Sequence, residues 1–535
     1  MPYFEKSIST TPSDAFSLGS ALSFCGGLIL TLFAFASTAH AQISGATKRQ
    51  PVIATGASSA TSKPLYLDAT QFASIQAAID STSCPTTGGC TVDARALPSS
   101  SVGDIDPGRK SVTILFGPQT YGIGQITIRP SLRIFGVGSG SGVTSTQQAT
   151  ILQALDANIT PFVMASGPVP GVDLEGFAVY GFGGSAPGVN ANKTPAFNLT
   201  ASGRSGGCFW CIFRDIGVLN FDGSNPTQKG PTGVFTFVGS PAGGGTLTNQ
   251  FIIMENVRNY RNSGKSYGLY VAGQNGQMYF TDCEFDGQGP ADPGTNIYIG
   301  VVAPGSGNNN VPYSLSFRGL TSQGAAVAVN INGATNIRFE HSRHEALAKG
   351  AYNITNPANP GDVWSSGIVI DSSFFAANVG VPNGYDVNIA TTAADLIFSH
   401  NLINGQPGHV IAGTQLNTVT YTDNSYNPAS NVSPVTSGIT PGFVPANTVN
   451  VGRYHVVMMQ PGSTPIQNIV SQLGPGETVT FTSNVGSVGQ TFEFATGGNL
   501  SIGSNASPLL VKSPDAVTFI RSDLSQTWYL IGKSF

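Results

Sequence analysis

The chain has 535 residues, a net charge of −4 at pH 7 and only 10% Asp, Glu, Lys and Arg. Without a basic excess, nucleic acid is excluded as an expected partner. Low charge together with many Gly and β-branched residues favours an all-β protein over a helical one.

Residues 1–41 have the pattern of a secretory signal peptide. Lys6 gives a weakly basic start, Gly27–Ala36 is an apolar core, and Ala39–Ala41 is a small-residue cleavage site. The core is too short to span a bilayer comfortably, although an uncleaved membrane anchor is the alternative. We expect a mature chain with a flexible segment at 42–66, secreted to the extracellular space or periplasm, with no membrane contact after cleavage.

Five cysteines follow the signal. Cys84 and Cys90 flank a Pro-Thr-Thr-Gly-Gly turn, and export permits a disulfide between them. Cys208 and Cys211 predict a local disulfide or two packed thiols, because no thioredoxin-like pattern surrounds them. A single pair of this spacing does not indicate zinc, and Cys283 is expected to be a small buried side chain.

A helix and three strands are expected before the central region. Ile75, Ala78 and Ile79 have the spacing of a short amphipathic helix within Ser74–Ser81. The first strands are then predicted at Val112–Gly122, Ile126–Pro130 and Leu132–Gly140.

The central region repeats one pattern at irregular intervals of about 20 to 40 residues. Each copy has period-2 alternation, a polar turn and a second short strand, as in VDLEGFAVYG from Val172, CIFRDIGVLN from Cys211 and IRFEHSRHEA from Ile337. Such a unit buries its apolar face only by stacking on its neighbours, so a solenoid is predicted, with the early helix covering its exposed end. A β-sandwich or propeller is the alternative, but propeller blades repeat at a more constant length.

The entry segment, SIQAAID followed by GGCTVDARAL and VTILFGPQTYGIGQITIRPSLRIFGVGSG, resembles that of the pectate lyase-like superfamily. The resemblance covers roughly residues 67–427 and implies a right-handed parallel β-helix with an N-terminal capping helix. The Asp-Asp, Gly-His-Gly and Arg-Ile-Lys set of polygalacturonases is missing, and Gly408–Val410 is a partial echo of it. RPSLR at Arg129–Arg133 is similar to a pectate lyase motif, but its place in the entry strands favours a structural role.

The C-terminal part is predicted to be separate. Residues 428–449 are dense in Pro, Ser and Thr and are expected to be a linker. Short alternating strands over 450–535 indicate a small C-terminal β domain. Similar terminal modules on tailspike-like proteins serve as trimerisation or sugar-contact units, which makes a homotrimer one expected assembly.

The stretch Asn336–Gly350 concentrates charge in a chain that has little. Aligning the copies pairs inward residues Leu315/Phe317, Ile337/Phe339 and Ile368/Ile370. The next residue of each copy points outward, and coils about 4.8 Å apart bring these residues into one column. They are Arg318, Glu340 and Asp371, with Arg338 beside them.

Two carboxylates next to arginine suit acid–base chemistry on a glycan, since proximity raises one pKa. Glu340 and Asp371 are the candidate catalytic pair. Arg318, Arg338, Arg343 and His344 are the candidate substrate-binding residues, Arg338 and Arg343 for anionic sugar groups and His344 in a groove wall. The alternative is a surface ion ladder without chemistry, or ligand binding alone.

Two further sets of polar residues have mainly structural interpretations. Asp282, Glu284 and Asp286 suit calcium in type. They need not converge, because they lie on either side of a turn, so no metal or other cofactor is assigned. The corner column is expected to bond to turn backbone groups; it consists of Asp215, Glu255, Asp282, Gly319, His341, Ser372 and His400.

The sequence therefore predicts a secreted, carbohydrate-active β-helix protein that cleaves or binds a polysaccharide along its groove. As an enzyme it would be a polysaccharide lyase or glycoside hydrolase. A noncatalytic adhesin, tailspike-like or structural extracellular protein is the alternative.

Overall fold

The computed structural model describes most of the chain beyond residue 64. The predicted signal at 1–41, the flexible segment up to residue 64 and most of the predicted linker lie outside the described residues. The described ranges are 65–98, 101–139, 149–184, 191–201, 206–222, 233–239, 249–261, 266–289, 292–302, 310–355, 365–376, 384–389, 394–403, 408–413, 419–422, 425–426, 448–452, 456–459, 465–471, 476–483, 491–503, 508–512, 515–522 and 527–534.

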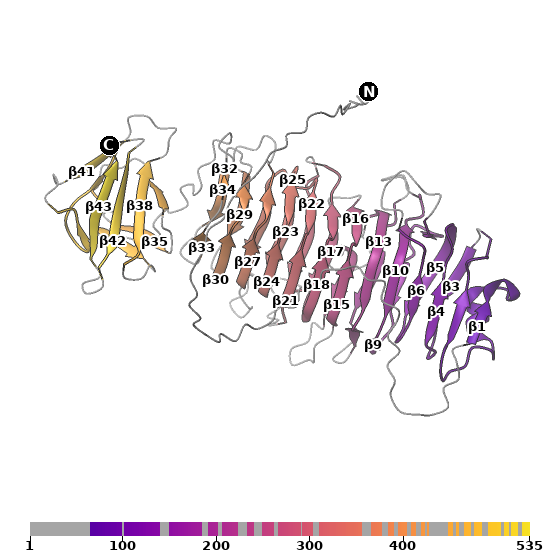
Figure 1. The fold of residues 1–535 in the computed structure, drawn as a ribbon. Coiled ribbons are helices and arrows are strands. Elements are labelled where there is room, and N and C mark those ends of the chain that lie inside the picture. The colour runs from indigo at the N-terminus through magenta and orange to yellow at the C-terminus, as the bar shows by residue number, and fades with distance from the viewer. Residues whose placement is uncertain are drawn as a thin grey trace, which may run out of the picture. The chain divides into compact units, whose positions relative to one another are not determined.

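The first 34 strands form a right-handed parallel β-helix, as the sequence predicted (Figure 1). Equivalent strands of consecutive coils pair in parallel, in three stacks around one apolar interior. The first stack carries the candidate site. It consists of β1 (Leu65–Asp68), β2 (Cys90–Asp93), β4 (Val112–Leu115), β6 (Arg133–Phe135), the first halves of β10 (Asp173–Tyr180) and β13 (Ile212–Phe221), β15 (Asn249–Glu255), β18 (Asn275–Thr281), β21 (Tyr313–Arg318), β24 (Thr335–Glu340), β27 (Ser366–Asp371), β30 (Ala394–Ser399) and β33 (Val419–Thr422).

The second and third stacks close each coil. The second contains β3 (Ser101–Ile105), β5 (Thr120–Ile128), β7 (Ile151–Ala154), the later halves of β10 and β13, β16 (Arg258–Arg261), β19 (Glu284–Asp286), β22 (Thr321–Gln323), β25 (Arg343–Glu345), β28 (Phe374–Phe375), β31 (Leu402–Ile403) and β34 (Ser425–Tyr426). The third contains the end of β5, β8 (Phe162–Met164), β11 (Phe197–Thr200), β14 (Gly233–Val238), β17 (Tyr267–Ala272), β20 (Thr295–Gly300), β23 (Val327–Asn332), β26 (Gly350–Thr355), β29 (Gly384–Ile389) and β32 (Gly408–Gly413). Two short strands, β9 (Pro168–Pro170) and β12 (Gly207–Phe209), come just before the first-stack segments of β10 and β13 in the chain.

Period-2 alternation fixes which side chains fill the interior. Leu315 and Phe317 are 1% and 0% exposed, and the predicted inward pairs of the next coils are equally buried. Aromatic rings stack from coil to coil inside the tube: the Phe197 ring centroid lies 4.5 Å from that of Phe162 and 4.7 Å from that of Phe235. The interior is thus a packed column and not a channel.

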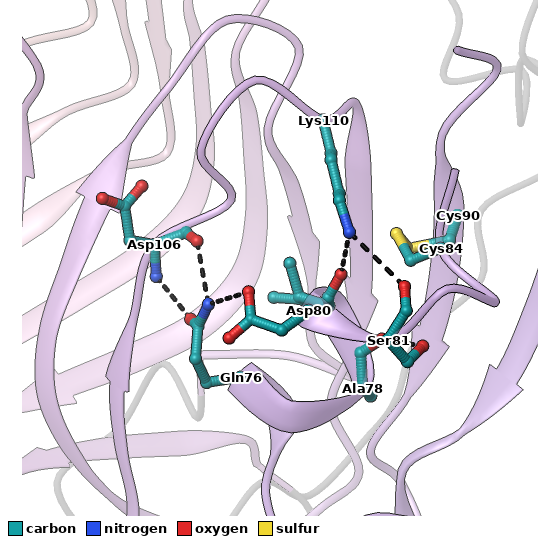
Figure 2. The surroundings of a disulfide bond; sticks show 9 residues. Gln76, Ala78, Asp80, Ser81, Cys84, Cys90, Asp106 and Lys110 are labelled. Atoms are coloured by element: carbon teal, nitrogen blue, oxygen red, sulfur yellow. Dashed lines mark hydrogen bonds between the residues drawn. A yellow bond between two sulfur atoms is a disulfide. The ribbon is translucent and has the colours of Figure 1, made fainter. Parts of the chain in front are cut away.

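The capping helix is present. Helix α1 (Ile75–Asp80) follows the 3-10 turn η1 (Ala69–Gln71), and Ser74 caps it by accepting from the Ala77 N–H. Its apolar face is fully buried. Figure 2 shows how the cap is tied down: Gln76 exchanges two hydrogen bonds with the backbone of Asp106, and Lys110 donates to carbonyls at the end of α1.

The cysteine predictions are confirmed. Disulfides join Cys84 to Cys90, beside the cap (Figure 2), and Cys208 to Cys211. Of the two alternatives for the second pair, the local disulfide is therefore present. Cys283 is a free, buried thiol whose pKa is raised by burial to about 12.

The C-terminal residues form sheets that are separate from the solenoid. The strands are β35 (Thr448–Gly452), β36 (Val456–Met459), β37 (Asn468–Ser471), β38 (Thr478–Ser483), β39 (Thr491–Phe494), β40 (Leu500–Ser501), β41 (Leu509–Lys512), β42 (Ala516–Arg521) and β43 (Trp528–Ser534). Phe481, Phe494, Phe519 and Trp528 are almost fully buried, and the rings of Phe481, Phe494 and Phe519 contact one another. No helix among the described residues is long and apolar enough to cross a membrane.

Candidate functional site

The predicted column of charged residues exists. Arg318 pairs in register with Glu340, and Glu340 pairs with Asp371, all on the outer side of the first stack. We call the full column the ladder: Glu175, Arg214, Glu255, Thr281, Arg318, Glu340, Asp371 and Ser399. Its members lie one coil apart; Glu175 and Arg214 are the third residues of β10 and β13, and the other six are the last residues of their strands.

The first part of the ladder is an ion network. The guanidinium of Arg214 contacts both carboxylates beside it, that of Glu175 at 3.1 Å and that of Glu255 at 2.9 Å. These groups are about one-third to one-half exposed, so each contact contributes at most about 1 kcal/mol. This part behaves as the solvated ion ladder that was the alternative to a catalytic site.

The candidate pair, Glu340 and Asp371, is held by different partners. Arg338 contacts Glu340 Oε1 at 2.6 Å within the same strand. Asp371 accepts hydrogen bonds from the hydroxyls of Ser399 and Ser372, and His400 Nδ1 lies 2.8 Å from Asp371 Oδ1. No contact between the two carboxyl groups is present among these interactions, so each is satisfied by its own neighbours.

The carboxyl group of Asp371 is held in its ionised form. Partial burial by itself would raise the pKa of Asp371, but hydrogen bonds from Ser399, His400 and Ser372 outweigh burial and hold the pKa below its ordinary value. This direction is opposite to that needed for the proton donor of the pair, but it suits the other role, that of an ionised base or nucleophile.

The corner that follows the ladder explains its polar sequence. Asp282, Gly319, His341, Ser372 and His400 all have positive φ, between 50° and 69°, in the left-handed region. Short polar residues and Gly tolerate this conformation best, which accounts for their recurrence here. The prediction of Glu255 in this column is wrong by one residue. The corner residue is Asn256, and it donates to Asp215 in the preceding coil.

The corner also separates the remaining candidates from the ladder. Arg343 lies beyond it, on β25 of the second stack, and contacts Glu345 at 2.8 Å. Arg338 and Arg343 are therefore both ion-paired within their own strands, and their role toward anionic sugars stays a prediction. Arg318 is exposed, and among the described residues no ion pair with it is formed.

The placement of His344 in a groove wall is wrong. His344 is 1% exposed and points into the solenoid, where its Nε2 lies 2.7 Å from the Tyr352 hydroxyl. Burial lowers the pKa of His344 to about 3, so the ring is neutral. The strand after the corner places Arg343 outward and His344 inward, and a side chain in the interior cannot contact a ligand on the outer surface.

The acidic stretch Asp282–Asp286 does not converge on one point. Asp282 is the exposed corner residue, whereas Glu284 and Asp286 lie on β19 of the second stack. Among the residues that the structure describes, no group of three or more His, Cys, Asp or Glu side chains is arranged to hold a metal ion. Asp286 is instead buried and accepts from the backbone and side-chain amides of Gln323.

The sequence missed an exposed aromatic cluster on the first stack. Trp210 and Phe251 stack with ring centroids 4.1 Å apart and planes 3° from parallel. Trp210 is 61% exposed, and Tyr279 and Ile253 are also exposed on the neighbouring strands. The only signal for Trp210 was its place between two cysteines, and Phe251 was read as an ordinary strand residue.

Comparisons with known proteins do not assign a family. No family model matches the chain, and no curated protein matches it. The likeness to the pectate lyase-like superfamily therefore stays a prediction, whereas the β-helix itself is shown.

Solved structures similar to the chain include a surface adhesin and a phage tailspike. PfbA, a surface adhesin of Streptococcus pneumoniae, has a TM-score of 0.37 and 12% identity, over 87% of this chain and 98% of that chain. The gp42 tailspike of Acinetobacter phage vb_AbaP_AS12 has a TM-score of 0.34 and 12% identity, over 79% of this chain and 74% of that chain. Because both TM-scores are below 0.5, we base the function on the chain's own geometry.

Proposed function

We propose that this chain is an extracellular, noncatalytic β-helix protein that binds a glycan along the outer face of its first stack. Two disulfides within the solenoid support an oxidising location. The ligand face, which we call the open face, runs from the Trp210 coil through the ladder to the His400 coil. Six steps of about 4.8 Å give a length of roughly 29 Å, which suits a polymer better than a small molecule.

The observation that carries this proposal is the difference in exposure between two outer faces of the solenoid. On the open face, Tyr279 is 47% exposed and Trp210 is 61% exposed. On the outer face of the third stack, the stacked rings of Tyr270 and Tyr298 are only 2% and 4% exposed. Aromatic rings left uncovered beside charged and hydroxyl groups suit a ligand with both apolar faces and polar edges, as sugars have.

The charges of the open face favour binding over cleavage. Glu340 is engaged by Arg338, and Asp371 is held ionised by its neighbours. Asp371 is therefore not the proton donor that glycoside cleavage needs, and Glu340 Oε1 is occupied by the guanidinium of Arg338. The pairing of Arg338 and Arg343 within their own strands likewise favours a neutral glycan over an anionic one.

Glycan cleavage by Glu340 and Asp371 is the second candidate, because their registered positions on adjacent coils do match the spacing of a carboxylate pair. A glycan array with a turnover readout separates the two functions. We expect wild-type protein to retain one or more neutral hexasaccharides without shortening them, and Glu340→Gln and Asp371→Asn to form no product either. Product formation that both substitutions abolish would establish the enzyme instead.

The homotrimer also stays a prediction. Sedimentation equilibrium of the full chain measures it directly: a trimer mass would support avidity on a repetitive glycan, and a monomer mass would remove that contribution without changing the open face.

A further inference from the structure

Trp210 and Phe251 belong to a column of residues with positive φ that lies at the start of the first-stack segments, and we call it the entrance column. Trp210 and Phe251 have φ of 58° and 55°. For a bulky side chain this conformation costs about 1–2 kcal/mol, and such strain tends to collect at functional sites. Elsewhere the column uses smaller or polar residues: Ser131, Gly171, Gln277, Ser314, Asn336, Gly367 and Asp395.

The backbone beneath Trp210 is fixed. The flanking Cys208 and Cys211 are fully buried and joined to each other. The Cys208 N–H donates to Asn249 Oδ1, and the Trp210 N–H donates to the Gln250 carbonyl in the next coil. The indole is therefore exposed on a rigid base, which lowers the entropic cost of binding a ligand on it.

One face of the indole is open. Phe251 covers the face toward the following coil, and yet Trp210 remains 61% exposed. The position in register on the preceding coil is Gly171, where an added Cβ would meet no atom within 4 Å. The next side chain of the column is Ser131, two coils from Trp210, or about 10 Å away. This leaves an opening about one ring thick, which we call the slot.

Polar side chains lie beside the slot. Asp173 follows Gly171 by two residues on the outer face and pairs in register with the exposed Arg133. Asp173 is half-buried, and its buried Oδ1 has no hydrogen-bond partner among the described residues. Because Oδ1 has almost no accessible surface, a bound ring would meet the exposed part of the Asp173 side chain and the Arg133 guanidinium, and both can form hydrogen bonds with hydroxyl groups.

We propose that the slot binds one pyranose ring of the glycan, with its C–H face on Trp210 and its hydroxyls near the side chains of Asp173 and Arg133. This rests on the proposed glycan-binding function and gives it a subsite and a ligand class, a neutral hydroxylated ring. A plain aromatic ligand would stack on Trp210 but would form no hydrogen bond with these two side chains. A sugar ring in the slot would continue the Phe251–Trp210 stack by one ring, at the coil where the column contains Gly171 and therefore no side chain.

The test compares two substitutions in the slot with a matched glycine control outside the open face. Trp210→Ala removes the stacking face. Gly171→Asn fills the slot with a residue that tolerates positive φ. Gly103→Asn makes the same change at φ 67°, with open space around it, on β3 of the second stack. The probe is a printed array of neutral and uronate-containing hexasaccharides, followed by calorimetry with the hexasaccharide that wild-type protein retains.

We expect Trp210→Ala and Gly171→Asn each to weaken binding about tenfold or more, and Gly103→Asn to bind within about twofold of wild type. Circular dichroism checks that all three fold. If wild type binds and the slot variants bind equally well, the slot is wrong while the glycan-binding function stands. If wild type retains no hexasaccharide, both proposals fail.

Discussion

His400 Nδ1 lies 2.8 Å from Asp371 Oδ1, although the two residues belong to different coils of the solenoid. The contact arises because the end of each strand and the following corner recur in register, so a corner residue of one coil reaches the ladder residue of the preceding one. It makes Asp371 part of a hydrogen-bonded cluster with Ser372 and Ser399. This relationship decides how the open face responds to pH.

Stability should fall in acid through Asp371. Its folded pKa is lowered, so its contribution is present above the ordinary Asp pKa and is lost as pH falls through the folded pKa. Asp371→Asn should therefore lower stability at pH 7 by about 1 kcal/mol and reduce the difference between pH 7 and pH 3. Urea unfolding at several pH values measures this. A variant as stable as wild type at pH 7 would show that the cluster contributes nothing.

Asp286 should have the opposite effect on the pH dependence of stability. Burial raises the pKa of Asp286 to about 8, and nearby Glu284 adds to this rise. The folded state then holds a proton that the unfolded chain has already released, so stability falls as pH rises from about 4 to about 8. We expect Asp286→Asn to flatten this part of the profile in the same urea titration. An unchanged slope between pH 5 and pH 8 would contradict a protonated Asp286.

Gly319 should resist substitution more than another glycine of similar φ. At φ 69°, an added Cβ would lie 2.2 Å from Asp282 Oδ1 in the preceding coil. Gly319→Ala should cost about 1–2 kcal/mol for the conformation and more for displacing Asp282. Gly103→Ala, at φ 67° with open space around it, is the matched control for the conformation alone. Equal losses of thermal stability would mean that Asp282 moves aside without cost.

The phenylalanine stack in the interior should carry a large share of stability. Phe197 is fully buried between Phe162 and Phe235, with further edge contact to Phe213. Phe197→Ala should cost about 3–5 kcal/mol, because the rings in the neighbouring coils cannot close the cavity. Phe197→Leu should cost less. Thermal unfolding that leaves the alanine variant within about 1 kcal/mol of wild type would show that the stack relaxes freely.

The sequence predicted the solenoid and the ladder because both follow from period-2 alternation. Once Ile337 and Phe339 are inward, Glu340 must end the strand on the outside, and stacking aligns it with Asp371. The irregular spacing of the copies correctly excluded a propeller.

The corners and the aromatic cluster could not be read in the same way. A residue in the left-handed region interrupts the alternation, so the corner residue was assigned as Glu255 in place of Asn256 and His344 was assigned to the wrong side of its strand. The same effect hid Trp210 and Phe251, since neither residue type signals positive φ. Their direction depends on the backbone of the entrance column, which is set by pairing between coils.

The open face is tested most directly by oxidative footprinting of the full chain with and without the hexasaccharide retained on the array. Tyr66 on β1 and Tyr529 on β43 are both exposed, and neither belongs to the coils of the open face, so they serve as internal controls. We predict that the glycan protects Trp210 and Tyr279 and leaves both controls unchanged. Protection confined to Tyr529 would place the ligand on the C-terminal sheets and would contradict binding along the solenoid.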